Sequence, residues 1–166
     1  MGHYHFERFQ WTFPLAVTLH NLEEAIWLPS WAAGHNTELS WQVTAVHFRL
    51  ALVFLTVAAY LVTWLSRKHG EQSRWTYLFV AYTFVMFLNV FVPHVPATVL
   101  FHGYTPGMVT AVIVNLPVTT TLLALAVQER VIPSLGIATL VFGIPLAIAL
   151  SAAALFAARL HFTAVH

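Results

Sequence analysis

Charged residues are scarce in this chain, and cysteine is absent. Without cysteine the chain can form neither a disulfide nor a thiolate metal site. Only 8% of its 166 residues are charged and 59% are hydrophobic, whereas soluble domains carry about a quarter charged residues. So few charges do not cover a globular surface in water. The composition therefore predicts an all-α, polytopic transmembrane helix bundle.

Several signals of other protein classes are also missing. The formal net charge of +1 gives no reason to expect a nucleic-acid partner. We find no phosphate-binding loop, no serine nucleophile elbow and no internal repeat. The first residues, MGHYHFERF, do not resemble a cleavable signal peptide. We therefore expect the first apolar segment to be retained, with membrane lipids as its surroundings.

About five segments are apolar enough to be considered as spans, which need roughly 20 residues each. They lie near residues 9–28, 44–65, 75–95, 108–128 and 132–158. The first is the weakest, because it contains Pro14 and then a histidine and two glutamates. Since the connections are short, we expect one integral membrane domain over residues 1–166.

The loop at residues 66–74 sets the expected orientation. It holds three of the seven basic residues, so the positive-inside rule places it in the cytoplasm. With five helices, the N-terminus is then cytoplasmic and the C-terminus outside. His47, His94, His102 and Tyr104 fall on the outer side, as does the polar end of the first helix. Residues far apart in sequence are thus expected at one depth.

That polar end is the stretch TLHNLEEAIW, in which His20, Glu23 and Glu24 share one helical face. An acid at mid-membrane costs about 2.5–3.5 kcal/mol, so the paired carboxylates need compensation. One carboxyl could be protonated, Arg49 could pair with one, or a divalent metal could bind. Alternatively, the helix ends near Leu19 and the glutamates reach headgroups or water.

Residues 20–24, HNLEE, and residues 104–107, YTPG, resemble the HXXEE-domain family of small, mostly bacterial membrane proteins. That family has an HXXEE motif, a further histidine and a YXPG motif, and the resemblance covers about residues 10–130. It implies a bacterial inner-membrane protein. His94 is our choice for the further histidine, and His102 is the competitor. A peptidase activity is suggested for the family from the likeness of its motif to metallopeptidase helices.

The spacing of the motif allows metal chemistry. His20 and Glu24 have the i, i+4 spacing of two zinc ligands on one helix, and Glu23 takes the place of the general base. His94 would complete a His–Glu–His set, with His47 or His102 as substitutes. Tyr104 could donate to a developing oxyanion. The cofactor expected is a divalent metal, with zinc the first choice.

Three functions follow from these observations. The first is a metal-dependent membrane hydrolase, peptidase-, amidase- or esterase-like, acting near the outer leaflet on a lipid-soluble small molecule. The second is a metal-free enzyme that transfers protons through histidine and glutamate, such as a lipid isomerase. The third is a protein that binds or transports a lipid, a cofactor or a metal. Asn89 and Asn115 could orient a histidine or hydrogen-bond between helices.

Overall fold

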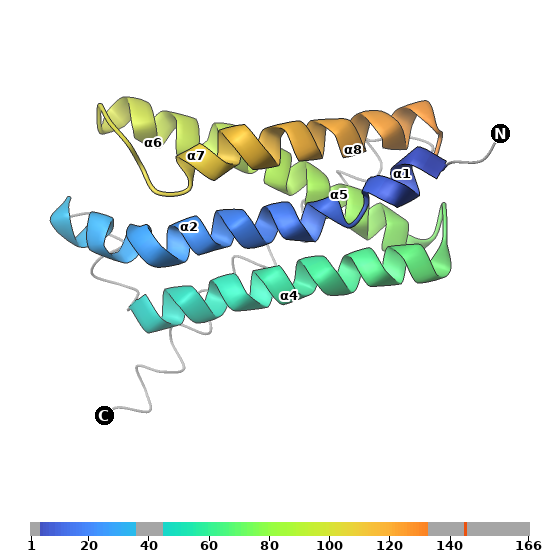
Figure 1. The fold of residues 1–166 in the computed structure, drawn as a ribbon, viewed down its shortest axis with the longest axis horizontal. Coiled ribbons are helices and arrows are strands. Elements are labelled where there is room, and N and C mark those ends of the chain that lie inside the picture. Colours follow the sequence, from blue (N-terminus) through green and yellow to red (C-terminus); the bar gives the residue numbers. More distant parts are fainter. Residues whose placement is uncertain (1–3, 36–44, 133–144, 146–166) are drawn as a thin grey trace.

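The computed structural model describes residues 4–35, 45–132 and 145, and these form helices that lie side by side (Figure 1). No strand occurs within these ranges, so the all-α prediction is confirmed. The elements in chain order are α1 (Tyr4–Phe9), α2 (Thr12–Gly34), α4 (Ala45–His69), α5 (Arg74–Asn89), η1 (Val90–His94), α6 (Val95–Leu100), α7 (Met108–Thr110), η2 (Ala111–Asn115) and α8 (Leu116–Gln128).

Three helical stretches of the described chain are long and apolar enough to cross a membrane: Ala45–His69, Arg74–Leu100 and Met108–Gln128. They match the predicted spans 44–65, 75–95 and 108–128. The fourth long helix, α2, is not among them because the polar residues in its middle lower its hydropathy. The fifth predicted helix, near 132–158, lies outside the described residues except for Ile132 and Pro145. Four long helices are therefore described rather than five.

Helix α2 is longer than predicted. It runs through the glutamates to Gly34, so the alternative in which the helix ends near Leu19 is wrong. Its 23 residues give it a length of about 34 Å, and it packs against α4 and α7. Pro14 lies in its first turn, where no intrahelical donor is lost.

Arg49 hydrogen-bonds to the backbone of α2 at the turn that Pro29 interrupts. Because proline has no N–H, Pro29 leaves the carbonyl of Ala25 without its intrahelical donor. The Nε of Arg49, from the second turn of α4, donates to that carbonyl over 3.0 Å. Arg49 therefore joins α4 to the backbone of α2. Among the described residues no ion pair joins Arg49 to Glu23 or Glu24, so the pairing that the sequence allowed is not found.

A kink separates α5 from α6. Val92, which precedes Pro93, is extended (φ −146°, ψ 107°) within otherwise helical backbone, as residues before proline prefer. His94 follows the kink and is buried. After α6 the chain turns back at residues 101–107 and enters α7, so α7 begins beside the middle of α2 (Figure 1).

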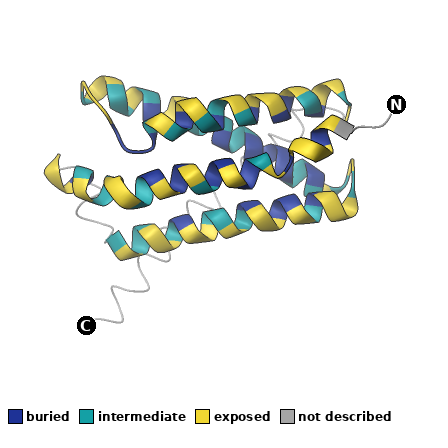
Figure 2. Ribbon diagram, viewed as in Figure 1, coloured by how far each residue is buried: buried dark blue, intermediate teal, exposed yellow. Residues whose placement is uncertain are grey.

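The apolar core lies toward the first turns of α2. The ring of Phe13 packs edge-on against Phe79 and Tyr82, with centroids 5.3 Å away in both cases. The hydroxyl of Tyr82 donates to the carbonyl of Leu55 over 2.9 Å. Figure 2 shows that α4 exposes much of its surface, which suits a helix that faces lipid. The core anchors one end of the bundle and leaves the polar residues at the other.

Candidate metal centre

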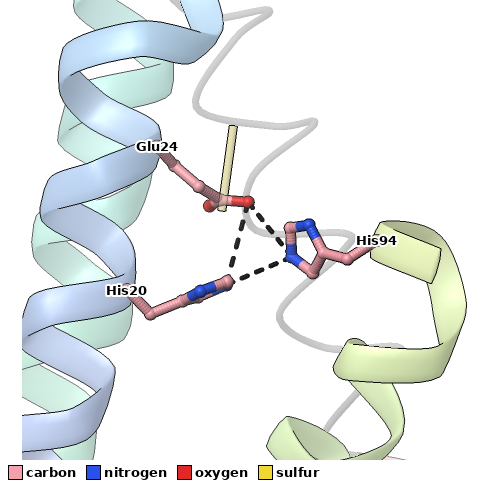
Figure 3. Close-up of side chains that lie close together, drawn as sticks. All are labelled: His20, Glu24 and His94. Carbon is pink, nitrogen blue, oxygen red and sulfur yellow. Dashed lines mark hydrogen bonds and ion pairs between the residues drawn. The ribbon is translucent and has the colours of Figure 1, made fainter. Parts of the chain in front are cut away.

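Three side chains converge between α2 and the kink after α5 (Figure 3). His20 and Glu24 lie one turn apart on α2, and His94 ends η1. The Nε2 atoms of the two histidines are 3.2 Å apart. The Oε1 atom of Glu24 lies 3.8 Å from Nε2 of His20 and 3.5 Å from Nε2 of His94.

These separations fit a shared ion. Zinc–ligand distances of about 2.0–2.2 Å in a tetrahedron place neighbouring ligand atoms about 3.3–3.6 Å apart. The three observed distances of 3.2, 3.5 and 3.8 Å lie close to that range. His20 is 1% and His94 4% exposed, and the Glu24 side chain is 15% exposed. Two imidazoles and a carboxylate are thus arranged around one small volume, as a divalent metal requires.

Asn89, at the end of α5, contacts both histidines. Its Nδ2 lies 3.1 Å from Nε2 of His20 and 3.1 Å from Nε2 of His94. The amide carries two hydrogens, so it can satisfy both imidazole lone pairs when no ion is present. Because Asn89 is on α5 and His20 is on α2, this position agrees with the second role that the sequence left open for Asn89, a hydrogen bond between helices.

Thr110 fixes the orientation of His20. Its hydroxyl donates to Oε2 of Glu23 and lies 3.1 Å from Nδ1 of His20. A hydroxyl has one hydrogen, so Thr110 accepts from His20, whose Nδ1 therefore carries the proton. The Nε2 atom of His20 then carries the lone pair, which accepts from Asn89 and lies on the side of Glu24 and His94. This is the tautomer that a metal ligand needs.

Glu23 faces α7 rather than the three ligand atoms. Its carboxylate accepts from the Tyr104 hydroxyl at 2.7 Å and from the Thr110 backbone N–H at 2.8 Å, besides the Thr110 hydroxyl. The N-terminal end of a helix favours a negative charge, so Glu23 stabilises the start of α7. Burial and this hydrogen bond to Glu23 raise the pKa of the Tyr104 phenol above its usual value.

Gly107, the last residue of the YTPG motif, allows this packing. Its φ is +90°, and a Cβ atom there would overlap the His94 ring and approach Glu24. Glycine is the residue that adopts this backbone without strain and adds no side chain. The motif therefore joins the loop to the HXXEE helix through Gly107 and Tyr104.

The remaining candidates lie elsewhere. Within the described ranges, the group of ligand atoms that lie within 4.8 Å of one another contains neither His47 nor His102. His47 is in the first turn of α4, and His102 is exposed in the loop with φ +50°. Asn115 is buried in η2, and its amide has no hydrogen-bond partner within the described chain. Thr110 was missed, because a threonine in an apolar run carries no local signal.

Comparison with known proteins agrees with the HXXEE motif. Residues 11–122 match the family described as "Protein of unknown function with HXXEE motif". The chain is 35% identical over 136 residues to the "Uncharacterized protein YrkK" of Bacillus subtilis (strain 168), an alignment that covers 80% of this chain and 84% of that protein. No solved structure matches the chain. This chain therefore belongs to the HXXEE family.

Proposed function

We propose that His20, Glu24 and His94 bind a divalent metal, preferably zinc, and that the protein is a metal-dependent membrane hydrolase. The observation that carries the proposal is the spacing of the three ligand atoms, 3.2–3.8 Å, at a buried position. Two histidines and one glutamate form a ligand set of catalytic zinc in hydrolases. Three protein ligands leave one position at the ion for water or substrate, which the ion activates.

Glu23 and Tyr104 have the proposed catalytic roles. A carboxylate offers about four lone-pair positions, and three donors from Tyr104 and Thr110 occupy the Glu23 carboxylate. Capacity for one more donor remains, which a general base uses. Tyr104 donates to Glu23 in this structure, so it would have to turn from Glu23 to reach a substrate oxygen.

The depth of the site supports a membrane substrate. Glu24 precedes Ala25, whose carbonyl meets Arg49 in the second turn of α4, and Glu23 meets Thr110 in the first turn of α7. The site therefore lies near one end of two helices that can span a membrane. We propose that this end faces the outer leaflet, because the basic loop at residues 66–74 joins α4 to α5 at the other end.

The test is the zinc content of the purified protein in detergent, measured by elemental analysis. We expect about one zinc per chain, and loss of that zinc in His20→Ala and His94→Ala. The matched control is His102→Ala, an exposed histidine outside the cluster, which should keep the metal. Full zinc in both His20→Ala and His94→Ala would remove the proposed site.

A second candidate rests on Asn89. Its Nδ2 lies 3.1 Å from the Nε2 atom of each imidazole, so its two hydrogens can satisfy both lone pairs without an ion. Such an arrangement suits proton transfer in a metal-free enzyme. If the protein is a metal-free enzyme, we expect no zinc in the purified wild type and no heat of binding when zinc is titrated into it. Calorimetry of the wild type therefore separates the two functions.

A further inference from the structure

A groove lies beside Glu23, on the outside of the bundle, between α2 and the start of α7. It has a volume of about 360 Å³, which is at the lower end of the size of small-molecule sites. Its apolar lining comes from positions on one face of α2 and from one residue of α7: Leu19, Leu22, Ile26, Trp27 and Val109. Each of these is half-exposed. An apolar groove beside membrane-spanning helices is open sideways to lipid chains.

The polar residues of the groove are Glu23, Tyr104 and Thr110. The Tyr104 and Thr110 hydroxyl hydrogens are both donated to Glu23. A ligand in the groove therefore meets only acceptor atoms, the carboxylate oxygens of Glu23 and the phenol oxygen of Tyr104. A ligand must therefore bring a hydrogen-bond donor. A carboxylate or a phosphate would instead meet the negative charge of Glu23.

We propose that the groove binds a long-chain amide, with its hydrocarbon chain along the apolar lining and its N–H toward Glu23. This substrate class rests on the proposed function, because a hydrolase gives a bound amide a reaction. Water would add to the amide carbonyl carbon and the C–N bond would break, giving a carboxylate and a protonated amine. The carboxylate product would be repelled by Glu23, which favours its release.

The binding test uses bromine as a contact quencher of Trp27. The wild-type protein in phosphatidylcholine nanodiscs is titrated with 9,10-dibromostearamide and, separately, with 9,10-dibromostearic acid at neutral pH. Trp27→Phe gives the background of the other five tryptophans. We expect the amide to quench Trp27 at about tenfold lower concentration than the acid, because only the acid carries a charge of the same sign as Glu23. Equal quenching by both probes would overturn the proposal.

Two valine variants locate the binding. Val109→Phe fills the groove and should weaken amide binding about tenfold through lost chain contacts. Val127→Phe is the control, because Val127 is 51% exposed, close to the 48% of Val109, and does not line the groove. Equal effects of the two variants would show that the probe partitions into lipid without using the groove.

Metal content is measured on the same samples, so the two proposals can fail separately. If the amide binds selectively but the wild type holds no zinc, the groove stands and the hydrolase fails. If zinc is present and lost in His20→Ala, but the amide and the acid quench alike, the metal site stands and the groove assignment fails. Chelation should leave amide binding unchanged, since the metal ligands do not line the groove.

Discussion

Gly107 is packed directly against Glu24: a Cβ atom built on this glycine would lie 3.0 Å from Oε1 of the carboxylate. That oxygen is the one that faces both histidines. The loop before α7 and the HXXEE helix therefore share one contact surface. A change in the loop is expected to move the carboxylate.

Gly107→Ala should weaken the site and the fold together. The left-handed backbone at φ +90° costs a residue with a Cβ atom about 1–2 kcal/mol, and the overlap with the His94 ring adds to this cost. We expect a lower thermal midpoint and loss of zinc. Gly103→Ala is the control, because its Cβ would meet only an ordinary contact of 3.8 Å to the Phe101 carbonyl oxygen. Equal midpoints for the two variants would contradict the packing argument.

The two adjacent glutamates should respond differently to removal of their charge. Glu24→Gln removes a proposed ligand, so we expect the zinc Kd to rise more than about 100-fold. This exceeds the usual effect of losing a residue that only hydrogen-bonds to a ligand. Glu23→Gln leaves all three ligand atoms in place and should raise the Kd at most about tenfold. Competition with a fluorescent chelator measures both values. A larger effect of Glu23→Gln would reverse the assignment of ligand and base.

Thr110 should act on the metal through His20. Thr110→Val keeps the shape of the side chain but removes the oxygen that accepts from Nδ1 of His20. We expect the zinc Kd to rise about 10–100-fold, as is usual when the partner of a ligating histidine is lost. Thr110→Ser keeps the hydroxyl and should retain the wild-type Kd. If serine fails to restore affinity, packing of the threonine methyl group explains the effect instead.

Tyr104 should make the stability of the protein fall in alkaline solution. Because its pKa is raised in the folded protein, the protonated phenol stabilises the fold below the unfolded value of about pH 10. This stabilisation is lost as the pH rises through the folded value. The thermal midpoint of the wild type should therefore drop more steeply above pH 10 than that of Tyr104→Phe. Parallel curves would show that Tyr104 does not contribute.

Hydropathy alone was sufficient to predict the three helices that are long and apolar enough to cross a membrane. The apolar runs near 44–65, 75–95 and 108–128 predicted α4, α5 with α6, and α7 with α8 to within about five residues, because lipid requires long apolar helices. The end of α2 was placed six residues early, at 28 instead of Gly34. The helix continues through Pro29. The compensating bond from Arg49 to Ala25 comes from another helix and has no local signal.

The site was predicted in part. The i, i+4 spacing placed His20 and Glu24 on one face, and His94 was preferred to His47 and His102 from the family pattern. The structure brings these three together because the chain kinks at Val92 just before His94. Glu24 faces His94 and Glu23 faces Thr110, and this difference depends on how α7 packs on α2. Sequence spacing alone could not separate their roles.

The bond between Arg49 and the Ala25 carbonyl has a consequence for how the protein responds to its surroundings. The guanidinium keeps its charge, but its hydrogen bond holds it at the Ala25 carbonyl, and among the described residues no ion pair joins it to Glu23 or Glu24. In the described part of the chain, the groups that face the Glu24 carboxylate are therefore His20 and His94 rather than a fixed cation. The state of the bundle end should thus follow the acidity and the free metal of the medium that it meets.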